Sequence, residues 1–202
     1  MIASDPSGSL VLFIIMEEAM VFIDGAYLSL ISKYLGRSKP LNFDIKKFAE
    51  KLIKKENLFC KEIYYYTCPP FQSGSFFEDE VKRKQGYDKF VNKLRKLGIK
   101  VREGRCQKIN NEFSQKGVDT LITIDMIRNA PSIKNFILVT CDTDFVPAIM
   151  DIKEKDKTKF IIYYFNDFIK FSKFSMSDHI LEVCDKKILL KKEDFNNISI
   201  DN

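Results

Sequence analysis

From Met20 onward, short apolar runs alternate with amphipathic stretches, and no other feature constrains the fold of this chain as strongly. The apolar runs predict strands, which lie at Met20–Asp24, Glu62–Thr67, Ile99–Arg102, Phe136–Thr140 and Lys159–Phe165. Parallel strands give such runs because helices cover both faces of the sheet that they form. The sequence therefore predicts an α/β three-layer sandwich with a mainly parallel sheet, in which each crossover is right-handed.

The stretches between these runs predict helices. Gly25 opens the first helix, and Asn42–Asp44 precedes a second one. Apolar residues of the second helix fall at helical spacing and are expected in the core: Ile45, Phe48, Ala49, Leu52 and Ile53. A long helix is expected at Glu78–Leu97, with one apolar face made of Tyr87, Phe90, Leu94 and Leu97.

The second half of the chain continues the alternation after one polar interruption. The polar stretch Glu103–Gln115 is expected to lead, as a connection, into a helix that begins near Asp119 and ends at Ala130. Another helix is predicted at Phe145–Lys155. The tail from Ser177 to Lys192 should add one helix and a short strand, Lys187–Leu190.

A length of 202 residues suits one domain. We expect it to span residues 20–192, after an N-terminal extension of residues 1–19 and before a tail of residues 193–202. The apolar run Leu10–Met16 is too short to cross a bilayer and follows no basic residue. It is an extra packing segment or, as we favour, sequence upstream of a start at Met16 or Met20.

Composition excludes several functional classes. The formal charge of +5 permits contact with a phosphate backbone without requiring it. Five cysteines without a CxxC pair, and a single histidine, His179, do not provide four clustered zinc ligands. Reduced thiols in a cytoplasmic protein account for them better. A Ser-His-Asp enzyme would need His179 as its base, and no nucleophile-elbow sequence accompanies it.

Four aspartates follow the predicted strands or begin the helices beside them. Asp24 ends the first strand, Asp142 and Asp144 follow the fourth, and Asp119 begins the intervening helix. In an open parallel sheet, ligands bind beyond the carboxyl ends of the strands. If the first and fourth strands are neighbours, the four carboxylates converge there and repel one another unless a cation is present. Oxygen ligands alone select a hard cation, Mg²⁺ or Mn²⁺.

Each aspartate also has a purely structural explanation. Asp142 or Asp144 could cap a helix, and Asp119 could simply occupy a first turn, where acids are favoured. For Asp24 this explanation is the weakest, and for all four together it is improbable. Other phosphate chemistries fit worse: Ala26 stands where a haloacid-dehalogenase-type phosphatase needs a second Asp, and neither GxGxxG nor GxxxxGK[ST] occurs.

Four segments, in order, resemble the motifs of the NYN family, the LabA-like branch of the PIN-like nucleases. They are Val21–Leu28 (VFIDGAYL), Tyr65–Pro70 (YYTCPP), Lys116–Asp125 (KGVDTLITID) and Leu138–Phe145 (LVTCDTDF). The resemblance covers about Met20 to Asp185. It implies a sheet order of 3-2-1-4-5 and metal-dependent hydrolysis of RNA, with Asp24, Asp119, Asp142 and Asp144 as the metal-binding and catalytic acids.

Three further residues are expected to support these acids. Asp125 matches a recurrent family position, but it lies six residues past Asp119 and off that residue's helical face. Thr140 lies within the fourth motif, two residues before Asp142. Tyr27 departs from the family, many of whose members carry Asn there. It is expected either to stack on a base or to mark an impaired site.

The sequence thus predicts a metal-dependent ribonuclease that uses Mg²⁺ or Mn²⁺. Basic residues would position the RNA backbone, with Lys116 the first choice, then Arg105 and Lys108, and Arg128 behind them. Solvated surface charge is an equally good explanation for Arg128. The alternative function is an RNA-binding or regulatory module with little turnover. The sequence predicts no membrane partner and leaves a homodimer open.

Overall fold

The computed structural model describes residues 2–4, 10–12, 16–74, 77–110, 112–167, 174 and 178–196. Its centre is a six-stranded sheet in the order β10-β9-β8-β3-β4-β5, and every neighbouring pair is parallel. The strands are β3 (Glu18–Asp24), β4 (Phe59–Thr67), β5 (Lys100–Glu103), β8 (Asn135–Val139), β9 (Lys159–Tyr164) and β10 (Lys186–Leu189). Counted along the chain, this is the expected 3-2-1-4-5 order, with the predicted terminal strand added at the edge.

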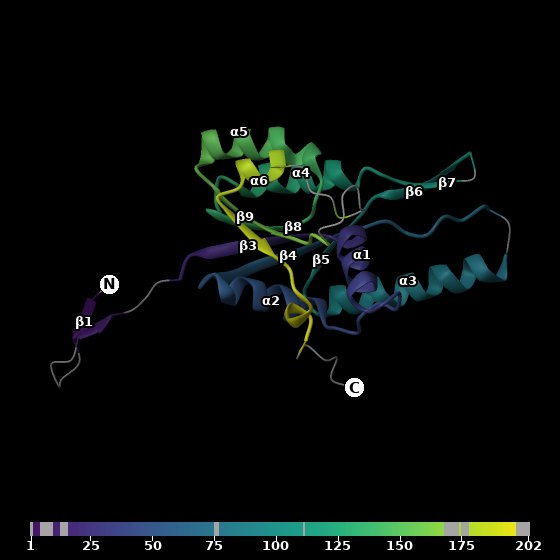
Figure 1. The fold of residues 1–202 in the computed structure, drawn as a ribbon, viewed down its shortest axis with the longest axis horizontal. Coiled ribbons are helices and arrows are strands. Elements are labelled where there is room, and N and C mark those ends of the chain that lie inside the picture. Colours follow the sequence, from purple (N-terminus) through teal and green to yellow (C-terminus); the bar gives the residue numbers. More distant parts are fainter. Residues whose placement is uncertain are drawn as a thin grey trace.

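Helices cover both faces of the sheet, so the three-layer sandwich is confirmed (Figure 1). The helices are α1 (Gly25–Leu35), α2 (Ile45–Lys55), α3 (Glu78–Lys96), α4 (Val118–Asn129), α5 (Val146–Asp156) and α6 (Asp178–Val183), with short 3-10 helices at η1 (Thr143–Phe145) and η2 (Lys192–Asp194). Val21 and Ile23 of β3 face the layer of α1 to α3, whereas Met20 and Phe22 face α4 to α6. Strand β3 is therefore apolar on both sides.

Helix α2 shows why the periodicity argument works for this chain. Its five predicted core residues, which are Ile45, Phe48, Ala49, Leu52 and Ile53, are all buried. The Asp44 side chain accepts a hydrogen bond from the backbone N of Lys47 at 2.9 Å and so caps the helix start. The prediction for α3 is less accurate, because Val91 and Leu94 are its buried residues while Phe90 is exposed.

The polar stretch Glu103–Gln115 contains secondary structure that the sequence does not predict. Its residues form an antiparallel hairpin of β6 (Arg105–Ile109) and β7 (Glu112–Lys116), separate from the main sheet. Ile109 pairs with Glu112, so the loop has two residues, and Asn110 takes a positive φ of 51°. Hairpin loops of this length favour asparagine for that reason. The pair Asn110-Asn111 was the sequence signal for the hairpin.

The N-terminal extension contributes two short strands that lie outside the six-stranded sheet. Strand β1 (Ile2–Ser4) pairs antiparallel with β2 (Leu10–Leu12). Within the described ranges, no helix is both long and apolar enough to cross a membrane.

Candidate functional site

The sheet topology brings the four predicted acids to one edge. Strands β3 and β8 are hydrogen-bonded neighbours, as the convergence of these residues requires. Asp24 is the last residue of β3, and Asp142 and Asp144 lie in the segment that follows β8. Asp119 is the second residue of α4, whose first turn points to the same edge. All four therefore stand at the carboxyl ends of the central strands, where open α/β sheets bind ligands.

The electrostatics show that these side chains are close enough to affect one another. The pKa of Asp24 is raised to about 6, mainly because the side chain is buried, and the charges of Asp119 and Asp142 contribute to the rise, whereas two backbone hydrogen bonds oppose it. Burial also raises the pKa of Asp119, together with the charges of Asp142 and Asp144. The carboxylates thus form one coupled cluster in which each negative charge is unfavourable.

Hydrogen bonds to the backbone orient two of the acids. Oδ1 of Asp24 accepts from the backbone N of Ala26 at 2.9 Å and of Tyr27 at 3.2 Å, so Asp24 caps α1. Asp24 thus has a structural role as a helix cap, which the sequence made less expected for it than for the other three acids. Oδ1 of Asp142 accepts from the N of Asp144 at 2.9 Å. In both carboxylates, Oδ2 has no hydrogen-bond partner among the described residues.

Thr140 holds the backbone of the segment after β8. Its buried side-chain oxygen accepts a hydrogen bond from the backbone N of Asp142 at 3.2 Å. This contact fixes the turn from which Asp142 and Asp144 project.

Gly25 allows α1 to begin directly beside β4. A Cβ at this position would lie 2.6 Å from the carbonyl oxygen of Tyr66 and 2.7 Å from the ring of Tyr65. The glycine is therefore required by close packing, and it keeps Asp24 and the start of α1 at the sheet edge.

The donor chemistry of the cluster fits a hard divalent cation. It consists of carboxylate oxygens only, and no described Lys or Arg forms an ion pair with any of the four acids. A cation would remove the repulsion that raises their pKa values. Among the described residues, however, no three acidic, histidine or cysteine side chains are gathered as metal ligands. The four acids are therefore close enough to affect one another's pKa values, but no three of them are gathered as ligands of one metal ion.

Tyr27 does not face a substrate, so the expectation that it could stack on a base is wrong. Its side chain is 4% exposed and belongs to the core. The phenol oxygen accepts a hydrogen bond from the backbone N of Phe165 at 2.8 Å and lies 3.5 Å from the carbonyl oxygen of the same residue. Tyr27 therefore ties α1 to the segment after β9.

Asp125 belongs to a buried network rather than to the acid cluster. Its Oδ2 accepts from the Tyr66 hydroxyl at 3.1 Å and from Nε of Arg102 at 2.9 Å. The carboxylate is neutralised by Arg102, which is the partner that sequence analysis missed. The network joins α4 to β4 and β5, so the role of Asp125 is structural.

Asp125→Ala should lower the free energy of unfolding by about 2–3 kcal/mol. The substitution leaves the buried Tyr66 hydroxyl unpaired and deprives Arg102 of its counter-charge. Urea denaturation measures the loss. Arg128→Ala on the same helix is the matched control, since Arg128 is exposed and should change stability by at most about 0.5 kcal/mol. Equal losses in the two variants would contradict the assignment.

The predicted basic residues separate into two groups. Arg105 and Lys116 are directly opposite each other on the hairpin, and Lys116 lies three residues before Asp119. Both line a cavity of about 460 Å³ together with Gly104. Lys108 is nearer the hairpin tip. Arg128 is exposed in the last turn of α4, roughly 13 Å along the helix from Asp119, and so lies away from the acids.

Comparison with protein families decides the classification. The NYN domain model matches residues 18–191, nearly the whole chain. The chain belongs to the NYN family. The match includes every strand of the main sheet and all four acids, so the family resemblance seen in the sequence motifs is confirmed.

The fold of this NYN domain also resembles a solved structure. A Vibrio parahaemolyticus protein of unknown function superposes with a TM-score of 0.63 at 19% sequence identity, over 92% of this chain and 99% of the other. At that identity the likeness shows the fold alone. No curated protein matches the chain.

Proposed function

We propose that this NYN domain is a metal-dependent ribonuclease. The observation that carries the proposal is the cluster of four aspartates at the carboxyl edge of the sheet, in which burial and mutual repulsion raise the pKa of Asp24 to about 6. A domain gains no stability from keeping like charges together, so such a cluster favours a cationic ligand. Membership in a nuclease-like family supports the same conclusion.

Each residue of the site has a distinct task in this proposal. Asp24, Asp119, Asp142 and Asp144 would hold Mg²⁺ or Mn²⁺, which when bound polarises a phosphate oxygen and activates water. The backbone hydrogen bonds on Asp24 and Asp142 fix the orientation of these two carboxylates. Arg105 and Lys116 provide the positive charge beside the acids that an RNA backbone requires.

A cleavage assay tests the proposal directly. End-labelled single-stranded and structured RNAs are incubated with excess protein, with Mg²⁺ or Mn²⁺ added or with EDTA. We expect cleavage that appears with metal and disappears with the chelator. Failure to cleave any RNA in a single turnover would reject the ribonuclease.

Replacing Arg105 and Lys116 together by Ala should weaken RNA binding without unfolding the protein, because both side chains are exposed. Each lost contact with a single-stranded phosphate should reduce the slope of log affinity against log salt by about 0.7. Titrations at several salt concentrations in EDTA measure this slope. Lys159→Ala is the control, since Lys159 is exposed at the opposite edge of the sheet. An unchanged slope in the double variant would exclude these residues from the interface.

One observation favours the second function, an RNA-binding or regulatory module with little turnover. The described acids are coupled but not gathered as three metal ligands. Titration of Mn²⁺ into the protein separates the two functions, because a nuclease requires saturable binding that Asp24→Asn abolishes. Because Tyr27 is buried, stacking of its ring on a base does not support the RNA-binding module.

A further inference from the structure

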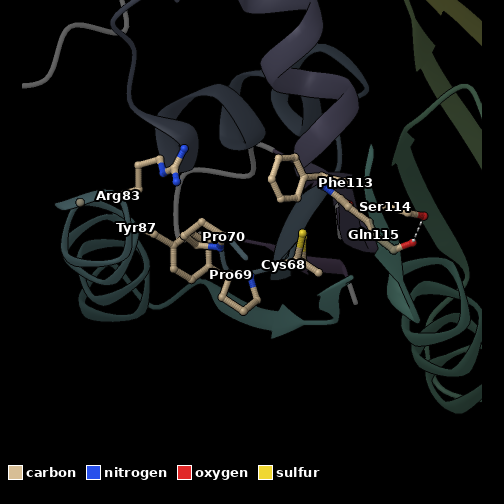
Figure 2. Close-up of a pocket in the computed structure, with 10 residues that line it drawn as sticks. Cys68, Pro69, Pro70, Arg83, Tyr87, Phe113, Ser114 and Gln115 are labelled. Carbon is tan, nitrogen blue, oxygen red and sulfur yellow. Dashed lines mark hydrogen bonds between the residues drawn. The ribbon is translucent and has the colours of Figure 1, made fainter. Parts of the chain in front are cut away.

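A second cavity, of about 470 Å³, lies beside the proposed site and has no part in metal binding. Its floor is the turn after β4, Cys68–Pro70. Arg83, Gly86 and Tyr87 of α3 form one wall, and Phe113–Gln115 of the hairpin form the other (Figure 2). This volume lies within the range of pockets that bind small organic groups, about 300–1,000 Å³.

Gly86 is the feature of this cavity that folding does not explain. It lies in the interior of α3, where glycine weakens a helix relative to almost any other residue. A Cβ there would meet no atom within 4 Å, and its φ is not positive, so neither close packing nor backbone conformation requires the glycine. What Gly86 does is leave the helix wall of the cavity free of a side chain.

The walls suit a flat, aromatic group attached to a negative charge. Tyr87 and Phe113 lie on opposite sides of the cavity, and in this view Pro69 and Pro70 are nearer to Tyr87 (Figure 2). Phe113 is 61% exposed, so much of its ring is accessible to a ligand. Aromatic side chains of this kind stack on unpaired bases.

Positive charge surrounds the same opening. Arg83 lines the cavity, and Nζ of Lys108 lies 5.9 Å from the centre of the Phe113 ring. A hydrogen bond from the backbone N of Ser73 lowers the pKa of Glu80, and the charges of Arg83 and Lys108 contribute, so α3 and the hairpin bring both cations towards one carboxylate. Glu80 neutralises part of this charge but does not line the cavity. An apolar slot with cations at its rim complements a nucleotide better than an apolar peptide.

The floor of the cavity is close to the acid cluster along β4. Its floor follows Thr67, the end of β4, and Asp24 is paired with Tyr66 of that strand. Gln115 of β7 lines this cavity, whereas the side chain of the next residue, Lys116, points to the opposite face of the strand and lines the cavity that it shares with Arg105. The cavity is therefore linked to the acids through the end of β4.

We propose that this cavity binds an unpaired base of single-stranded RNA, between Tyr87 and Phe113, and so selects unpaired substrate for the adjacent acid cluster. The inference rests on the proposed function only in taking RNA as the substrate. Duplex RNA keeps its bases stacked internally, so it cannot present one to the cavity.

The test measures binding without cleavage. The full-length chain carrying Asp24→Asn is titrated in EDTA with a short single-stranded oligoribonucleotide in which 2-aminopurine reports stacking. Gly86→Leu, which adds a side chain to the wall of the cavity, should weaken binding about tenfold and abolish the change in fluorescence. Its melting temperature should be unchanged or about 2–4 °C higher, because the helix gains a better helix former. Gln85→Leu, on the same helix but outside the cavity lining, is the control and should bind like the parent.

A second pair of variants tests the stacking face. Phe113→Ala should weaken binding at least about fivefold, whereas Phe59→Ala should not. Phe59 is a matched control because it is 55% exposed but begins β4, at the opposite end of the strand from the cavity. The melting temperature of each variant shows whether it is folded, and so whether a loss of binding reflects the missing ring.

The outcomes separate this inference from the proposed function. RNA affinity that is equal in parent, Gly86→Leu and Phe113→Ala would overturn the base pocket and leave the nuclease untouched. Duplex RNA binding as tightly as single-stranded RNA, or no binding by the parent in EDTA, would overturn it as well. If RNA binding depends on the cavity but the protein with Asp24 intact never cleaves RNA, the pocket is supported and the nuclease is rejected.

Discussion

Asp24→Asn is expected to lower RNA cleavage by about a hundredfold or more while the protein stays folded. The substitution removes the most buried charge of the acid cluster and one ligand of the proposed cation. A hundredfold loss corresponds to about 2.7 kcal/mol of transition-state stabilisation, within the several kcal/mol that a catalytic metal supplies. Single-turnover rates with Mn²⁺ and excess protein measure the effect.

The choice of asparagine separates catalysis from folding. Asp24 also caps α1 through Oδ1, and an asparagine side chain caps a helix as well as an aspartate does. The helix start should therefore survive, and RNA binding through Arg105 and Lys116 should change far less than cleavage.

Asp44→Asn provides the matched control for this experiment. Asp44 caps α2 in the same way, away from the acid cluster, so its substitution should leave cleavage at the parental rate. If the Asp24→Asn protein cleaves RNA as fast as the Asp44→Asn protein, the activity belongs to another site or another protein.

The sequence predicted the main sheet because each of its strands carries its own signal. Strand β8 (NFILV) is buried at every position, and a run of this kind has few alternatives to a central parallel strand. The positions of Asp24 and Asp142 then follow from topology, since the carboxyl ends of neighbouring parallel strands meet at one edge. Candidate ligands were thus predictable from local patterns together with one pairing.

The parts that escaped prediction depend on contacts between distant residues. No residue of β6 or β7 is buried, so alternation of apolar and polar side chains could not reveal these strands. The partner of Asp125 is Arg102, on a different strand, and no local pattern pairs them. The base-sized cavity needs three segments, from β4, α3 and the hairpin, to come together. The sequence shows a glycine at position 86, but only the structure shows that this glycine lies beside open space.

The contribution of Asp24 to the stability of the metal-free protein should fall as pH rises from about 4 to above about 6. The folded protein holds the proton of Asp24 up to a pKa of about 6, whereas the ordinary value is 3.8. Between these values the folded state binds more protons than the unfolded state, so raising the pH favours unfolding. The penalty is absent below pH 3.8 and complete above about 6, where it amounts to at most about 3 kcal/mol. This sign is opposite to that of a salt-bridged carboxylate.

Asp24→Asn should remove this pH dependence and make the metal-free protein more stable at pH 7 than the parent. Urea denaturation in EDTA at several pH values between 4 and 7.5 measures both effects, with Asp44→Asn again as the control. A divalent cation should stabilise the parent more at pH 7 than at pH 5, because protons compete for the same carboxylate oxygens. The Asp24→Asn protein should gain little from the cation at either pH. If the stability of the parent and that of the Asp24→Asn protein change in the same way between pH 4 and 6, ionisation of Asp24 does not lower the free energy of unfolding. The acid cluster would then have no unfavourable charge for a cation to relieve.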